Sequence, residues 1–187
     1  MGRFLLLLAL LAALGVGAWL YFGDGLRIVT ERSVEVALVE AAARFQGGHY
    51  GKFQLATIHM VDKLCVADPN HEPRFFQSPR FAEQNNPVTF LTCHEADMLM
   101  HILGAGVRPT RVRATGFATK LPSLTPIAVK GYDMVDTEVT FDNGGVAHIV
   151  TGWHLPNAAH ALTVERFRMY CAEGMVDMEL DKPGMCE

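Results

Sequence analysis

The stretch MVDTEVTFDNGGVAHIVTGWH, residues 134–154, decides the fold. Apolar and polar side chains alternate on both sides of its centre, and the flanking segments are rich in β-branched residues, which is typical of half-buried strands. The central Asp142–Asn143–Gly144–Gly145 tolerates positive φ and favours a tight reversal. The stretch therefore predicts a β-hairpin with strands over 134–141 and 145–154.

Further strand-like segments lie on either side of this hairpin. They are rich in β-branched and aromatic residues and cover residues 53–61, 110–119, 163–172 and 175–180. The corner Ala172–Glu173–Gly174 predicts a second hairpin between the last two of them.

Two earlier segments follow the helical period instead. Residues 31–45 and 92–103 carry apolar side chains near helical spacing, and each is followed by glycine. Thr92 is a suitable N-cap, and Glu95 would complete a capping box. Because strands then follow one another along the chain, we expect an α+β fold: an open, mostly antiparallel sheet with helices on one face.

The composition excludes several classes of protein. Of the 187 residues, 50% are hydrophobic and 19% are charged, and the net charge is -4. The chain has enough apolar residues to build a core, which excludes a disordered or low-complexity protein. It contains no basic run, so we expect no nucleic-acid partner.

The N-terminus is apolar enough to enter a membrane. Residues 4–22 carry no charge, and Arg3 precedes them. As a helix they would span about 28 Å, so residues 1–23 are expected to form a transmembrane anchor or signal peptide, and residues 24–187 the folded domain. The positive flank predicts a single-pass membrane protein with its domain exported, or a secreted or periplasmic one if the helix is cleaved. A misassigned start codon or gene fragment is a third interpretation.

The four cysteines, Cys65, Cys93, Cys171 and Cys186, are too far apart in sequence for a CxxC metal or redox pair. An even number in an exported domain allows one or two disulfides. Buried free thiols are the preferred interpretation.

The densest polar cluster is on the second predicted helix. His94, Asp97 and His101 would share one helix face, which could hold a proton-transfer group or a metal. A zinc-protease motif is excluded because Met98 stands where it requires a second histidine, and no metal is expected. His148 and His154 share a strand face, where packing or an interface is the simpler role.

Residues 66–87 contain repeated proline and asparagine, and they predict a surface loop. Arg74 and Arg80 in this loop are candidates to hold a carboxylate or sugar hydroxyls. No serine occurs in a GxSxG motif, and the GxG at residues 15–17 has Leu20 where a third glycine is needed. We therefore expect no nucleotide cofactor bound by this chain alone.

Several short motifs follow one another along the chain. They are Gly48–Phe53, His94–Asp97 followed by an apolar helix, the strand and Asn143–Gly144 turn followed by Thr151–Pro156, and Glu173–Asp177. In this order the sequence from about residue 34 to 187 resembles the C-terminal domain of the glucose-fructose oxidoreductase, inositol dehydrogenase and MocA (Gfo/Idh/MocA) family.

The resemblance implies a sheet that covers a sugar or polyol site and forms the oligomer interface, beside a preceding Rossmann domain that binds NAD(P). His94 matches the family histidine that assists proton transfer, and Asp97 matches the acidic residue one helical turn later. Phe90 stands where many members have a catalytic aspartate, and the Rossmann domain has no counterpart in the sequence. NAD(P) would therefore come only through a partner.

Three functions follow as hypotheses. The first is a membrane-anchored or exported domain that binds a sugar or polyol, or forms oligomers, without its own NAD(P) site. The second is a subunit of a split NAD(P)-dependent sugar oxidoreductase, with His94 as general base and a Rossmann-bearing partner. The third is a structural scaffold in which Trp153 and the strand-face apolar residues build a dimer.

Overall fold

The structure is a computed structural model that describes residues 33–180 and 182–183. Its elements, in chain order, are α3 (Ser33–Gln46), β1 (Phe53–Lys63), η2 (Leu64–Val66), α4 (Phe81–Gln84), the π-helical turn η3 (Val88–Thr92), α5 (Cys93–Leu103), β2 (Pro109–Phe117), η4 (Leu121–Ser123), β3 (Met134–Phe141), β4 (Val146–Leu155), β5 (Ala161–Cys171), β6 (Met175–Glu179) and β7 (Lys182–Pro183). The chain divides into two units, with the boundary inside α3, after Glu40. All the strands of the described residues belong to the second unit.

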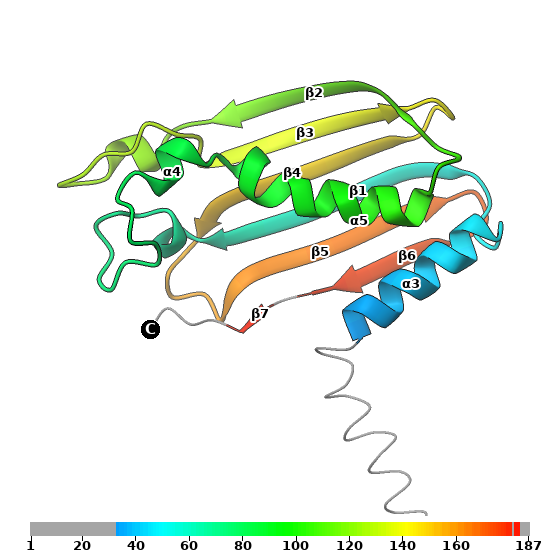
Figure 1. Cartoon of the computed structure of the whole chain (residues 1–187), viewed down its shortest axis with the longest axis horizontal. Helices are drawn as coiled ribbons and strands as arrows, with labels where there is room; N and C mark the ends of the chain where they lie inside the picture. The colour runs from blue at the N-terminus through cyan, green and yellow to red at the C-terminus, as the bar shows by residue number, and fades with distance from the viewer. Residues whose placement is uncertain (1–32, 181, 184–187) are drawn as a thin grey trace, which may run out of the picture. The chain divides into compact units, whose positions relative to one another are not determined.

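The strands form one mixed sheet in the order β2-β3-β4-β1-β5-β6, with β7 paired to β5 (Figure 1). The α+β class is confirmed, and all but one of the strand pairs are antiparallel. The exception is β1 beside β4, whose parallel register runs from Leu55 opposite Val146 to Val61 opposite Gly152. A parallel pair needs a long crossover, here the helices together with β2 and β3, and local sequence signals do not reveal it.

Both predicted hairpins are confirmed. β3 pairs with β4 across the Asp142–Gly145 turn, where Gly144 has φ 84° and the Phe141 N–H donates to the Gly145 carbonyl at 2.9 Å. A Cβ at Gly145 would clash with the ring of Phe53, so this position needs glycine for space. β5 pairs with β6, and the Cys171 N–H donates to the Gly174 carbonyl.

One face of the sheet carries the core. Ile58, Ile149 and Phe167 on the three central strands are 0% exposed. Figure 1 shows α5 lying across this face, and Leu99, Ile102 and Leu103 are the buried apolar residues of that helix. The Gln46 side chain donates to the carbonyls of His101 and Ile102 at the C-terminal end of α5.

The predicted capping box at Thr92 is wrong. Thr92 has helical φ and ψ because η3 runs directly into α5, so the chain is already helical at this residue. Its hydroxyl instead lies 2.7 Å from the hydroxyl of Thr151 on β4, and Glu95 is 0% exposed. Packing against the sheet, rather than a local cap, fixes the start of α5.

Among the cysteines that the structure describes, the expectation of buried free thiols is confirmed for Cys171 and wrong for Cys65 and Cys93. Cys65 is disulfide-bonded, whereas Cys93 is free and exposed and Cys171 is free and buried. Burial raises the pKa of the Cys171 thiol.

The transmembrane or signal helix expected at residues 1–23 lies outside the described residues. Within residues 33–180 and 182–183, no helix is long and apolar enough to cross a membrane.

Candidate functional site

The exposed side of α5 carries the polar residues that the sequence singled out. His94, Asp97 and His101 are all exposed, on the side of the helix opposite Leu99 and Ile102. In the described part of the chain, the side chains of His94 and Asp97 make no hydrogen bond or ion pair, with each other or elsewhere. No set of side chains among the described residues could hold a metal ion. The two candidate catalytic residues are thus accessible but not preorganised.

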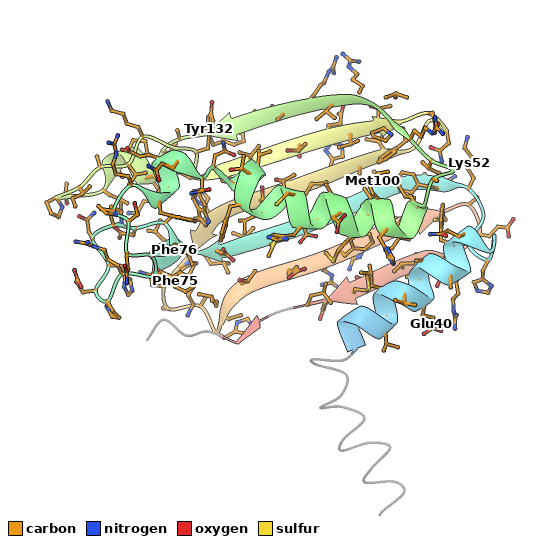
Figure 2. The ribbon with its side chains drawn as sticks, in the orientation of Figure 1. Glu40, Lys52, Phe75, Phe76, Met100 and Tyr132 are labelled. Carbon is orange, nitrogen blue, oxygen red and sulfur yellow. The ribbon has the colours of Figure 1, made fainter. Side chains whose placement is uncertain are left out.

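The position four residues before His94 is filled by an aromatic cluster. Phe90 lies edge-on to Phe76 and Phe81, with ring centroids 5.8 and 5.1 Å away. Phe76 and Phe81 are themselves stacked at 3.8 Å, and Phe81 contacts Trp153 at 6.2 Å. Figure 2 labels Phe75 and Phe76 at this end of the molecule. A proton-transfer partner for His94 is therefore absent from this position, and apolar rings occupy the space around it.

The two candidate substrate-binding arginines have partners within their own loop. The Nε of Arg74 donates to the carbonyl of Pro69 at 3.0 Å. The Nε of Arg80 donates to Glu83 at 2.9 Å, and this hydrogen bond holds the pKa of Glu83 below its usual value. Their assignment to a substrate stays a prediction.

The role expected for Trp153 in a dimer does not fit its position. The side chain is 0% exposed and packs in a cluster with Met60, Leu91 and Leu121. Its parity on β4 places it on the helix-covered side of the sheet. Trp153 therefore belongs to the core, and any sheet interface must use other residues.

The opposite face of the sheet has no such core. Residues across it alternate with the buried ones along each strand, so that Asp136, His148 and Val150 align in register with Thr57 and His59 on β1. The His148 Nδ1 lies 3.5 Å from the Asp136 carboxylate, and both side chains are partly exposed. We call this surface the open face. His148 lies on it as the strand parity predicts.

The edge of the open face is held by ion pairs. Arg166 and Arg168 on β5 both contact Asp177 on β6, the latter at 2.8 Å, and Arg166 also contacts Glu179 at 2.6 Å. The hydrogen bonds from Arg168 and Arg166 lower the pKa of Asp177. Sequence reasoning missed this network, because its members lie on two strands and only the hairpin register brings them together.

Sequence reasoning also missed a buried carboxylate beside the sheet. Asp133 is 0% exposed and accepts hydrogen bonds from the backbone N–H groups of Thr119, Lys120 and Leu121 and from the Thr119 hydroxyl. Burial raises its pKa, but these hydrogen bonds outweigh burial and hold the pKa below its usual value. Asp133 thus fixes the loop that leads from β2 into η4.

Comparison with known proteins agrees with the fold. No family model matches the chain, and no curated protein matches it by sequence. Among solved structures, it is similar to a putative oxidoreductase from Thermotoga maritima, with a TM-score of 0.60 and 17% identity over 76% of this chain and 40% of that one.

Two of the structures that this chain resembles are enzymes named after a sugar or a polyol. One is a levoglucosan dehydrogenase solved with NADH and levoglucosan, with a TM-score of 0.59 and 23% identity over 77% of this chain and 36% of that one. The other is the myo-inositol 2-dehydrogenase from Lactobacillus plantarum, with a TM-score of 0.57 and 16% identity over 76% of this chain and 38% of that one.

These structures are oxidoreductases of the Gfo/Idh/MocA type, and the chain spans about two fifths of their length or less. The fold that the sequence resemblance implies is thereby confirmed.

Proposed function

We propose that this chain is an oxidoreductase-like sheet domain that does not catalyse a reaction alone, and that it serves as a sugar- or polyol-binding and oligomerisation module, anchored in a membrane or exported. The observation that carries the proposal is Phe90, which packs edge-on against the stacked rings of Phe76 and Phe81. Where the resembling enzymes have a catalytic aspartate, this chain has an apolar cluster, and NAD(P) would be supplied only by a partner.

The open face supports the oligomerisation part of this proposal. On this face the half-buried Val146 and Val150 lie in register with Leu55 and His59 on β1, between the charged side chains of β3 and those of β5 and β6. Apolar residues ringed by charges suit a self-complementary interface, in which the same surface of two copies meets across a twofold axis.

Sedimentation of the full-length chain in mild detergent tests the oligomer. We expect Val150→Glu to weaken self-association at least about tenfold, because it places a charge at the centre of the interface. Val112→Glu is the matched control, since Val112 is 63% exposed on the opposite face of β2. A wild-type chain that sediments as a monomer would exclude the oligomer, and a thermal melt of Val150→Glu excludes misfolding as the cause of dissociation.

The disulfide at Cys65 supports export, because structural disulfides persist mainly in oxidising compartments. The chain has four cysteines, and Cys93 and Cys171 are free. We expect alkylation of the denatured, unreduced protein, purified from its native cells, to label two thiols. Labelling of all the cysteines would contradict export.

A split oxidoreductase is the second candidate, and the exposure of His94 and Asp97 on α5 favours it. Detergent extraction from native membranes, with mass spectrometry and NAD(P)H fluorescence of the eluate, would test for a Rossmann-bearing partner. If one copurifies with nucleotide, we expect His94→Ala to abolish turnover of the pair and His101→Ala, on the same helix face, to preserve it. Unchanged turnover in His94→Ala would eliminate this candidate.

A further inference from the structure

A cavity of about 450 Å³ lies at the end of the sheet where β1 and β4 both stop. Because the two strands are parallel, their C-terminal ends meet there (Figure 1). Leu64, which follows β1, and Leu155, which ends β4, contribute apolar walls, and Thr119 and Lys120 close the cavity from the loop before η4. The rings of Phe76, Phe81 and Phe90 do not line it, but Trp153, which lines it, contacts Phe81 of the aromatic cluster beside His94.

The walls of the cavity are held in place by hydrogen bonds. The backbone N–H groups of Thr119 and Lys120 donate to the buried carboxylate of Asp133. On the other side, the Asn157 Oδ1 accepts a hydrogen bond from the Cys65 N–H at 2.9 Å. A cavity between two anchored loops is preformed, which reduces the ordering that a ligand must impose.

Most donors of the polar lining have no partner within the protein. The Thr119 hydroxyl donates to Asp133, but the Lys120 ammonium, the His154 ring and the Asn157 side-chain nitrogen have no hydrogen-bond partner within residues 33–180 and 182–183. Lys120, His154 and Asn157 are exposed, so their polar groups are available to a ligand in the cavity. The indole N–H of Trp153 also lacks a partner among the described residues, but it is fully buried and supports the wall rather than contacting a ligand.

The charge of the lining residues limits the class of ligand that the cavity can bind. No aspartate or glutamate of the described residues lines the cavity, and both Asp133 oxygens already accept hydrogen bonds from residues 119–121. Lys120 is the one permanent cation among the lining residues. One cation with several neutral donors suits a monoanion that also carries hydroxyl groups, and the leucine, proline and tryptophan walls suit a carbon skeleton rather than a bare inorganic ion.

We propose that this cavity binds a small hydroxylated carboxylate, a sugar acid, with its carboxylate at Lys120 and its hydroxyl oxygens accepting from the side-chain nitrogen of Asn157. The inference rests on the sugar- or polyol-binding part of the proposed function and names its ligand class.

The test is a titration of the full-length chain in mild detergent, followed by isothermal calorimetry, with D-galacturonate and D-galactose as probes that differ only in the carboxylate. We expect saturable galacturonate binding that is at least about tenfold tighter than that of galactose, as loss of a charge-assisted hydrogen bond implies. Lys120→Met should weaken galacturonate about tenfold or more, because its exposed side chain contributes the charge and not the fold. Lys52→Met, at the opposite end of the sheet, should leave binding unchanged (Figure 2).

Three results would overturn the inference. Equal affinity for galactose would leave a sugar-binding module without the carboxylate specificity, so the inference would fail and the proposed function would stand. Tighter binding of inorganic phosphate than of galacturonate would exclude a sugar acid as the ligand. The absence of any heat with all three probes would refute both the inference and the sugar-binding part of the proposed function, while sedimentation would still test the oligomer.

Discussion

The two faces of the sheet are built from alternate residues of the same strands, but different forces stabilise them. On β4, Ile149 is 0% exposed beneath the helices, whereas the next residue, Val150, is half-buried on the open face. On β5, likewise, Phe167 is 0% exposed on the covered face and Arg168 is half-buried on the open face. The covered face depends on close packing, and the open face on ion pairs.

The carboxylates of Asp133 and Asp177 make the same contrast in electrostatics. Both have a lowered pKa, but buried backbone N–H groups stabilise the Asp133 carboxylate, and partly exposed arginines stabilise that of Asp177. The lesson is that a lowered pKa has different weight for stability at a buried and at an exposed carboxylate, because water and salt screen only the exposed pair.

The largest difference in stability is expected between variants of two neighbouring residues on β4. We expect Ile149→Ala to reduce the free energy of unfolding by about 2–5 kcal/mol, because it leaves a cavity in the core. Val150→Ala should cost about 1 kcal/mol or less in the monomer. Urea unfolding at low protein concentration measures both, and equal losses would refute the division into a packed face and an open face.

Substitution of Asp133 should have the next largest effect on the free energy of unfolding. We expect Asp133→Asn to lower the free energy of unfolding at pH 7 by about 1–3 kcal/mol, because buried donors lose a charged acceptor. Since the folded-state pKa lies below the ordinary value of 3.8, the stabilisation is complete above that pH and is lost as the pH falls towards the folded-state pKa.

The stability gap between wild type and Asp133→Asn should therefore narrow as the pH falls below 3.8. Urea unfolding at a series of pH values measures this gap. A gap that stayed constant with pH would show that ionisation of Asp133 is not its source.

Asp177→Asn should cost less than Asp133→Asn, because the arginines of its ion pairs can be solvated by water once the charge is removed. Its effect should also shrink in about 1 M salt, where charges are screened within about 3 Å. Urea unfolding at low and high salt measures this, and Asp133→Asn is the control whose effect should persist in salt.

The smallest effect on the free energy of unfolding is expected for His94, the candidate general base. His94→Ala should change the free energy of unfolding by no more than about 0.5 kcal/mol, because the side chain is exposed and has no partner among the described residues. A thermal melt measures it. A large loss would mean that His94 supports the fold, and activity changes in this variant could not then be assigned to chemistry.

Much of the fold could be predicted from the sequence because its signals are local. The Asp142–Gly145 and Ala172–Gly174 turns, the strand alternation and the apolar face of α5 each depend on residues close in the chain. The parallel pairing of β1 with β4 could not be predicted, since it depends on where the chain returns after a long crossover. The capping box at Thr92 failed for a related reason, because Thr151 lies 59 residues away.

The sequence by itself determined the class of the fold, the hairpins, and the presence of Phe90 where the resembling enzymes have an acid. Only the tertiary structure decided that Phe90 packs in an aromatic cluster, that Trp153 is core, and that Lys120, Trp153 and Asn157 meet at one cavity. The physical reason is the range of the interactions. Turn chemistry and side-chain periodicity act over a few residues, whereas a binding cavity requires side chains that only the pairing of distant strands brings together.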